Sequence, residues 1–408
     1  MNRTLVIVGA SYAGVQLAAS AREYGFDGRI VLLGDEPDAP YQRPPLSKAY
    51  LSGAFSEARL PLRSQAFFDE ERIEWVPSMR ATYIDRARHE VELHDGTRIG
   101  YTHLALTTGA RVRKLDCPGA QLDAVHYLRD LRDARRLARA ARSGRRAVVI
   151  GGGYIGLEAA ASLRQMGIEV TVVETEARVL ARVASPWMSE FMQRAHEMHG
   201  IAFRCGRKVV AVQPDRDAVS IVLDDDTHLP CELVVVGIGV VPNTEIAAEC
   251  GLTVTGGIAV DECARTNDPA IVAAGDCASF VPHWAPAGSR ACRVESVQNA
   301  NDMAKTAAAT IAGRPEAYRA VPWFWSDQYD LKLQIAGINT GFTHHAVRGS
   351  IEEKKFSIFY FRDDALIAVD SINRPQEHML ARKLLAKGAK LTLNEAQDSA
   401  FDLKGATQ

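Results

Sequence analysis

Short apolar runs recur along the chain, and two of them lead into a glycine-rich turn and a helical pattern. In residues 4–34, TLVIVG, AGVQLAASAREYG and RIVLLG follow one another, which predicts strand, turn, helix and strand. In residues 146–174 the same order recurs as RAVVIG, GGYIGLEAAASLRQMG and EVTVVE. Two copies of this unit predict two nucleotide-binding domains in one chain, one for each of two dinucleotides.

The rest of the pattern is strand-rich. Residues 89–110 predict a hairpin that turns at Asp95-Gly96 and then a further strand, and residues 201–236 alternate as strands do. The proline-rich segment 35–51 predicts an ordered loop that leads into a short helix. From residue 321 the composition shifts to antiparallel strand patterns, with a hairpin near Asp363-Asp364 and a helix over HMLARKLLAKG. This part predicts a separate C-terminal α+β domain.

The second glycine-rich turn has the complete G-x-G-x-x-G pattern. Gly151, Gly153 and Gly156 follow a strand and open a helix, where the first glycine makes the turn and the second lets the backbone approach a pyrophosphate. The helix N-terminus adds free N–H donors. Glu174 ends the next strand, where its carboxylate can accept from ribose hydroxyls and would repel a 2′-phosphate. The unit predicts an NADH site.

The first turn lacks the middle glycine. Gly9 and Gly14 occupy the outer places, and Ser11 stands between them. Its hydroxyl can donate to a phosphate oxygen, or the side chain is only accommodated. Asp35 follows the next strand as the ribose acid, with Glu36 as the alternative.

A third apolar strand breaks at GDCA, residues 275–278. Asp276 can present its carboxylate to a chain of hydroxyls while the following helix faces a phosphate, or it can be an ordinary helix N-cap.

Composition limits the function classes. A net charge of −2 over 408 residues argues against a strongly basic nucleic-acid binder, and the longest apolar runs are about half of what spans a bilayer. The N-terminus has no signal-peptide pattern, so we expect a cytoplasmic protein with no membrane partner. The seven cysteines are widely spaced and include no C-x-x-C pair, which argues against a disulfide framework, a zinc ribbon, an iron–sulfur ligand set and a redox dithiol. No other metal-ligating cluster stands out, so we expect no metal site.

Several longer motifs occur in one order along nearly the whole chain. They are VIVG-x-x-x-AG, YQRPPLSKAYL, TTGA, VVIGGGYIGLE, VVVGIGVVPN, GDCA, ESVQNA and PWFWSDQY. With them the sequence resembles the FAD-dependent NADH:ferredoxin reductases of bacterial oxygenase systems. The resemblance implies an α/β fold with two Rossmann-like, glutathione-reductase-like domains. The FAD domain would take residues 1–114 and 242–320, the NAD domain 115–241, and an α+β domain near the flavin 321–408.

The resemblance also implies site residues. FAD would contact Ala13, Asp35, Arg43, Lys48, Ala81, Arg129, Asp276 and Val297. The nicotinamide cofactor would contact the turn from Gly151 through Gly153, Tyr154, Ile155 and Gly156, with Glu158, Glu174, Gly239 and Glu295 beyond it. The catalytic candidates are Lys48, Glu158 and Trp325.

Two of these assignments have plain alternatives. Arg43 and Lys48 flank two prolines and suit an anionic cofactor, but they can equally belong to a solvated loop. The aromatic run Trp323, Phe324 and Trp325 lines the flavin or forms an aromatic core.

The expected reaction passes electrons from NADH through FAD, singly, to a [2Fe–2S] ferredoxin, since no thiol pair is available as a relay. The chain is expected to be a monomer or weak dimer. Lys305 matches a basic docking position of the resembling family. The run 129–146, with eight arginines, is a second docking candidate or a solvated helix face. The alternatives are an NADH oxidase, a rubredoxin or nitrite reductase component, and a non-enzymatic redox sensor.

Overall fold

The computed structural model of the chain describes residues 3–216, 218–283 and 290–407. The chain divides into two compact units, each assembled from three segments. The segments of unit 1 are Met1–Gln42, Ala58–Arg111 and Val241–Pro322, and those of unit 2 are Arg43–Glu57, Val112–Val240 and Trp323–Gln408. The three-domain division inferred above stays a prediction. Two of the crossings between units fall within β8 (Ala110–Val112) and β17 (Val240–Pro242).

Unit 1 is built on a five-stranded parallel sheet in the order β19-β7-β1-β2-β3. Four of its strands are largely buried apolar runs, as expected for parallel strands, whereas the edge strand β3 is buried only at Ile73. They are β1 (Thr4–Val8), β2 (Arg29–Leu33), β3 (Ile73–Val76), β7 (His103–Leu106) and β19 (Ile271–Ala273).

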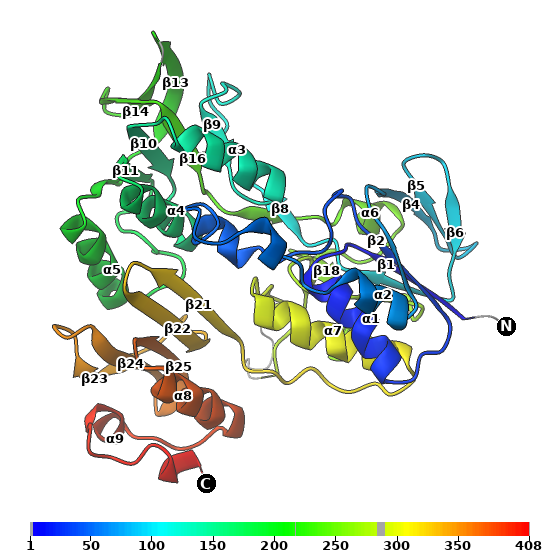
Figure 1. The fold of residues 1–408 in the computed structure, drawn as a ribbon. Helices are drawn as coiled ribbons and strands as arrows, with labels where there is room; N and C mark the ends of the chain where they lie inside the picture. The colour runs from blue at the N-terminus through cyan, green and yellow to red at the C-terminus, as the bar shows by residue number, and fades with distance from the viewer. Residues whose placement is uncertain (1–2, 217, 284–289, 408) are drawn as a thin grey trace. The chain divides into compact units, whose positions relative to one another are not determined.

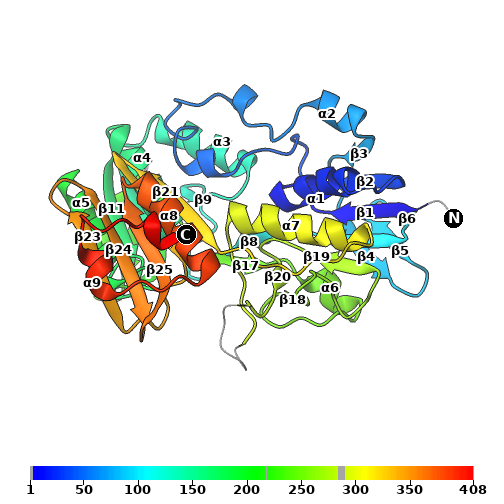
Figure 2. The same cartoon turned by 90° about the horizontal axis from the view of Figure 1, so that it is seen from below.

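Two helices of unit 1 lie side by side, as both views show (Figures 1 and 2). They are α1 (Tyr12–Glu23) and α7 (Val297–Ile311). Both carry buried small residues, such as Ala18 and Ala21 on α1 and Ala304 and Ala307 on α7, which allow the close approach. Two shorter helices, α2 (Gln65–Glu70) and α6 (Glu245–Glu249), complete this unit.

The predicted hairpin at Asp95-Gly96 is confirmed. It joins β5 (Glu90–Leu93) to β6 (Arg98–Gly100), and β4 (Ala81–Asp85) completes a three-stranded antiparallel sheet. The short strands β18 (Ile258–Ala259) and β20 (Ala278–Ser279) pair in parallel.

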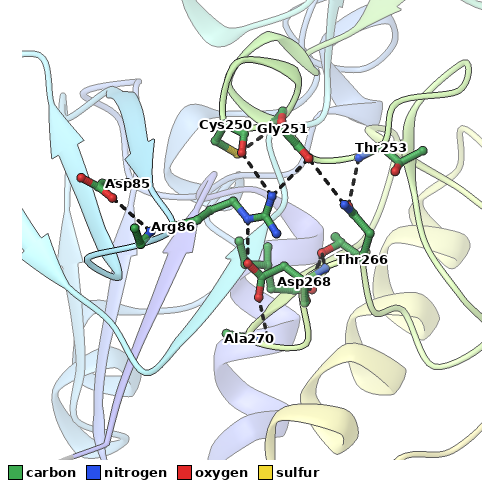
Figure 3. Close-up of polar contacts among 12 residues, drawn as sticks. Asp85, Arg86, Cys250, Gly251, Thr253, Thr266, Asp268 and Ala270 are labelled. Atoms are coloured by element: carbon green, nitrogen blue, oxygen red, sulfur yellow. Dashed lines mark hydrogen bonds and ion pairs between the residues drawn. The ribbon is translucent and has the colours of Figure 1, made fainter.

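Arg86 joins two distant segments of unit 1 (Figure 3). Its Nε donates to Asp268 Oδ2 at 2.7 Å, and its Nη1 donates to the carbonyls of Cys250 and Gly251. Burial opposes the ionisation of Asp268, but the hydrogen bonds from Arg86 and from the Ala270 N–H outweigh it and lower the pKa of that carboxyl. The ion pair thus connects the loop that follows β4 to the third segment of unit 1, Val241–Pro322.

Unit 2 contains a second five-stranded parallel sheet, in the order β12-β11-β10-β16-β9. Its strands are β9 (Val125–Tyr127), β10 (Arg146–Ile150), β11 (Glu169–Glu174), β12 (Ala202–Cys205) and β16 (Leu233–Val236). The accompanying helices are α3 (Leu131–Ala141), α4 (Tyr154–Gln165) and α5 (Pro186–Met198). An antiparallel sheet is made by β13 (Val209–Asp215), β14 (Ala218–Leu223) and β15 (His228–Cys231).

The C-terminal part of unit 2 is an antiparallel sheet in the order β21-β22-β25-β24-β23. Its strands are β21 (Trp323–Gln328), β22 (Leu331–Gly337), β23 (His344–Ser350), β24 (Lys355–Arg362) and β25 (Ala365–Ile372). The predicted hairpin at Asp363-Asp364 joins β24 to β25 and is confirmed. The helix α8 (Pro375–Lys387) packs on the sheet, and α9 (Leu393–Gln397) follows (Figure 2).

The proline-rich loop becomes the 3₁₀ helix η1 (Pro44–Ser47), which confirms the predicted short helix. It lies beside α4 (Figure 1), where Ser162 Oγ donates to the carbonyl of Ser47 at 2.8 Å. None of the described helices combines the length and the apolar character that crossing a bilayer requires.

Candidate functional site

The first glycine-rich turn lies between β1 and α1, in unit 1. Gly9 has a φ of +115°, and a Cβ there would lie 2.2 Å from the carbonyl oxygen of Thr107. A Cβ on Gly14 would lie 1.9 Å from the Gly9 oxygen. Both glycines are therefore fixed by the fold itself.

Ser11 is the N-cap of α1, with φ −122° and ψ −158°. This extended conformation suits any residue, so the backbone does not require glycine at the middle place. The structure thus explains why serine is tolerated there. A hydrogen bond from its hydroxyl to a pyrophosphate stays a prediction.

The predicted ribose acid follows β2 and has a cationic partner. Arg80 donates to both carboxylate oxygens of Asp35, at 3.0 and 2.6 Å, and the predicted FAD residue Ala81 comes directly after Arg80. The alternative acid, Glu36, instead accepts from the hydroxyl of Tyr41. Asp35 is more than half exposed, so its carboxylate is open to a ligand while it is held in place.

The Gly275-Asp276 break packs against the helices of unit 1. Gly275 has a φ of +82°, and a Cβ there would lie 3.1 Å from that of Ala13 and 3.8 Å from that of Ala300. The strand β20 follows Asp276, so the N-cap alternative is wrong. The following helix, α7, starts at Val297 after its N-cap Ser296. The break and the N-terminal turns of α1 and α7 thus meet in one place.

The second turn lies between β10 and α4, in unit 2. Gly151 has a φ of +108°, and Cβ atoms on Gly151 and Gly156 would lie 2.4 Å from the Gly237 oxygen and 2.1 Å from the Gly151 oxygen. Gly153, the N-cap of α4, has an extended backbone, and a Cβ on it would meet nothing within 4 Å. The chain itself does not require glycine at 153, so the free space fits the close approach of a ligand.

Glu174 ends β11 beside this turn. Its Oε2 accepts from the Gly152 N–H at 2.6 Å, and its Oε1 accepts from the Glu176 N–H at 2.9 Å and from the Thr175 hydroxyl. These bonds hold a negative charge beside the second glycine-rich turn. Gly239, with a φ of +96°, lies two residues after Gly237, whose backbone packs on Gly156.

A buried ion pair joins η1 to α4. Lys48 Nζ lies 2.8 Å from Glu158 Oε2, and the two side chains are 17% and 1% exposed. Ser47 Oγ donates to the same oxygen at 2.5 Å, and Ser326 Oγ donates to Oε1 at 2.6 Å. The structure therefore brings together the predicted catalytic residues Lys48 and Glu158.

The polar partners Ser47 and Ser326 of Glu158 were not predicted. Ser47 lies inside the motif YQRPPLSKAYL and Ser326 inside PWFWSDQY. The available signal was the period-2 alternation of the second motif, which sets Phe324, Ser326 and Gln328 on one face of the strand.

The remaining predicted positions of unit 2 flank these features. Arg43 Nη1 donates to the carbonyl of Arg129 at 2.7 Å. Ile155 is 45% exposed at the start of α4. Trp325 lies 5.6 Å from Trp323 between ring centroids. A contact of any of these residues with a cofactor stays a prediction.

Three further predictions concern charged groups. Glu295 belongs to unit 1 and pairs with Arg293 at 2.8 Å, whereas the turn at Gly151 belongs to unit 2. Lys305 on α7 is half-exposed and lies 3.4 Å from Asp302. In the run 129–146, four arginines pair with carboxylates: Arg132, Arg135, Arg136 and Arg146. These pairs favour the alternative that the run is a solvated helix face rather than a docking surface.

The described cysteines include no disulfide. Burial raises the pKa of the Cys231 thiol to about 11 and also raises the pKa of Cys277, so neither is a reactive thiolate at neutral pH. Within the described residues, no cluster of His, Cys, Asp and Glu could hold a metal ion.

Comparisons with known proteins agree with this geometry. The pyridine nucleotide-disulphide oxidoreductase family matches residues 3–304, and the Reductase C-terminal family matches residues 323–407. Rhodocoxin reductase from Rhodococcus erythropolis is 47% identical over 98% of this chain and 93% of its own length. Putidaredoxin reductase from Pseudomonas putida is 38% identical over 99% and 96%.

Two solved structures match over almost their whole length. A ferredoxin reductase from Rhodopseudomonas palustris has a TM-score of 0.96 at 45% identity, with both chains fully covered. Putidaredoxin reductase in its covalent complex with putidaredoxin has a TM-score of 0.95 at 38% identity, covering 99% of this chain and 98% of that one. These matches confirm the predicted fold class and the family that the motifs resemble. The chain belongs to the pyridine nucleotide-disulphide oxidoreductase family and, within it, to the ferredoxin reductases.

Proposed function

We propose that the protein takes electrons from NADH, through FAD, and passes them one at a time to a [2Fe–2S] ferredoxin that serves an oxygenase. One observation carries the proposal: a single chain holds two turns of the same build, each with outer glycines that the fold requires and each with a carboxylate fixed at the next strand. This is the arrangement that two dinucleotides need. The name of putidaredoxin reductase, crystallised in covalent complex with putidaredoxin, supports the ferredoxin as acceptor.

The turn at Gly9, with Ala13, Asp35, Ala81, Asp276 and Val297, is the proposed FAD site of unit 1. The N-terminus of α1 supplies N–H donors to the pyrophosphate, and Asp35, held by Arg80, supplies acceptors for ribose hydroxyls. Arg43, Lys48 and Arg129 are the proposed FAD contacts of unit 2. FAD, when bound, accepts a hydride and releases its two electrons singly.

The turn at Gly153 is the proposed NADH site. The N-terminus of α4 faces the pyrophosphate, and Glu174 accepts from the adenosine ribose while it repels a 2′-phosphate. Glu158 holds Lys48 through their ion pair, and its own two carboxylate oxygens accept one hydrogen bond each from Ser47 and Ser326. Trp325 is proposed to lie at the electron exit, and Lys305 to contact the acceptor.

The test is steady-state reduction of cytochrome c by NADH with purified, FAD-loaded protein. We expect the rate to depend on added [2Fe–2S] ferredoxin and to rise with its concentration until it saturates. Equal rates without any ferredoxin would contradict the proposal, and oxygen consumption at the same rate would identify an NADH oxidase. A rubredoxin that replaced the ferredoxin at lower concentration would identify the acceptor as a mononuclear iron protein.

A further inference from the structure

One face of β21 carries a row of side chains that meets two helices of unit 2. Phe324 packs against Tyr154 with ring centroids 4.8 Å apart and the rings tilted by 39°, Ser326 bonds to Glu158, and Gln328 bonds to His196. Tyr154 and Glu158 are one helical turn apart on α4, so the alternation of the strand matches the period of the helix. The strand therefore places its polar side chains against the buried acid.

The polar contacts form one directed chain. Gln328 Oε1 can only accept, so His196 Nε2 is the protonated nitrogen and donates to it at 2.6 Å. Gln328 Nε2 donates to Ser326 Oγ at 2.9 Å, and Ser326 Oγ donates to Glu158 Oε1 at 2.6 Å. Every proton in the chain points toward the Glu158 carboxylate, which favours its negative charge.

Burial makes each link of this chain costly to break. Ser326 and His196 are 0% exposed, and Gln328 and Glu158 are each 1% exposed. Removing one hydroxyl or amide would leave a partner unsatisfied without access to water. A network of this kind holds its members in a single arrangement.

This series of hydrogen bonds ends at His196. Its Nδ1 makes no hydrogen bond with any part of the chain that the structure describes, and the rings of Phe203 and Tyr329 pack against it edge-on. Burial lowers the pKa of His196 to about 4, so the ring is neutral at physiological pH. Because this series of hydrogen bonds ends at a neutral ring with no further partner among the residues that the structure describes, it cannot conduct a proton to solvent. It is suited instead to holding Glu158 in place.

We infer that Ser326, Gln328 and His196 are positioning residues that fix the Glu158 carboxylate and, through it, the Lys48 ammonium at the flavin. This inference rests on the proposed function, in which Lys48 contacts FAD. An ammonium held there favours the reduced, more negative flavin and so supports hydride transfer from NADH.

The test is a double-mutant cycle between Lys48→Met and Ser326→Ala, with Gln328→Met as an independent break in the same chain. The matched control is Ser357→Ala. Ser357 is also 0% exposed and donates to a buried carboxylate, Glu377, at 2.6 Å, but it belongs to a different network. The measurements are FAD content, melting temperature, the limiting rate of flavin reduction by NADH in stopped flow, and the flavin midpoint potential.

We expect Ser326→Ala and Gln328→Met to lower the limiting rate about tenfold without changing the NADH concentration for half-saturation. The midpoint potential falls in the same variants, and a tenfold change in the two-electron equilibrium corresponds to about 30 mV. In the Lys48→Met background, Ser326→Ala changes neither quantity further. Ser357→Ala lowers the melting temperature and leaves rate and potential as in the wild type.

Additive effects of Ser326→Ala and Lys48→Met would overturn the inference and leave the proposed role of Lys48 intact. It would also be overturned if Ser326→Ala and Gln328→Met only lowered the melting temperature, as Ser357→Ala does. A Lys48→Met variant with wild-type rate and potential would instead refute the proposed role of Lys48, and the inference with it.

Discussion

Glu174 Oε2 accepts a hydrogen bond from the backbone N–H of Gly152 at 2.6 Å, so the acid at the end of β11 is anchored to the glycine-rich turn beside it. The carboxylate cannot swing away from a ligand at this turn without losing that bond. Its charge is thereby kept where the adenosine ribose of the nicotinamide cofactor is proposed to bind. Cofactor preference should therefore depend on this side chain.

We predict that Glu174→Gln lowers the NADH-to-NADPH ratio of kcat/KM by about tenfold or more, because a fixed negative charge no longer opposes the 2′-phosphate. Initial rates with both cofactors measure the ratio. Glu169→Gln, at the exposed start of the same strand, is the control and should leave it unchanged. An unchanged ratio in Glu174→Gln would remove the carboxylate as the basis of selectivity.

Gly153 offers a test of the second turn. Gly153→Asp should fold with wild-type stability, because the position is an extended N-cap with no atom within 4 Å of a new Cβ and aspartate is a preferred N-cap residue. It should weaken NADH binding about tenfold or more, because a carboxylate would stand in the space proposed for the pyrophosphate and repel it, which the small neutral Ser11 of the first turn does not do. Calorimetric titration and thermal melting measure the two effects.

The contrasting variant is Gly156→Ser, whose Cβ would lie 2.1 Å from the Gly151 oxygen. It should lower the melting temperature, since the backbone must move. If Gly153→Asp bound NADH as tightly as the wild type, the free space at this turn would have no role in binding.

Arg86 should contribute strongly to the stability of unit 1. We predict that Arg86→Met lowers the free energy of unfolding by about 2 kcal/mol, because Asp268 and two backbone carbonyls lose their donor. Arg265→Met removes an exposed pair with Asp261, where water screens the charges, and should cost much less. Urea unfolding compares the two, and equal losses would count against a special role for Arg86.

Asp370 should make stability depend on pH. It is 0% exposed in β25, accepts from the hydroxyl of Tyr360 at 2.7 Å, and burial raises its pKa from 3.8 to about 7. Between these two values the folded state binds more protons than the unfolded state. The contribution to the free energy of unfolding is therefore full at acid pH and is lost as the pH rises toward and through about 7.

Asp370→Asn keeps the acceptor for Tyr360 and removes the titration. We predict that the urea midpoint of the wild type falls relative to that of Asp370→Asn as the pH is raised from 5 to 8.5. The exposed Asp364→Asn should follow the wild type over this range. Parallel curves for the wild type and Asp370→Asn would show that the buried carboxyl does not titrate here.

The sequence patterns predicted both parallel units, both hairpins and the short helix of the loop, because each depends on local periodicity and on glycines in turns. The partners of Glu158 could not be predicted in this way. Ser47 lies 111 positions from Glu158 in the chain and Ser326 lies 168 positions from it, and no local pattern determines which polar groups meet at such separations. The tolerance of Ser11 likewise needed the backbone angles of the turn, since the motif alone shows only a missing glycine.

In the proposed reaction, two electrons from one NADH leave singly to a [2Fe–2S] ferredoxin. The most direct test is an anaerobic titration in which FAD-loaded protein, excess oxidised ferredoxin and a limiting amount of NADH are mixed, and ferredoxin reduction is followed by its visible absorbance. We predict two ferredoxins reduced for each NADH consumed. NADH that is consumed with no reduced ferredoxin formed would contradict the account.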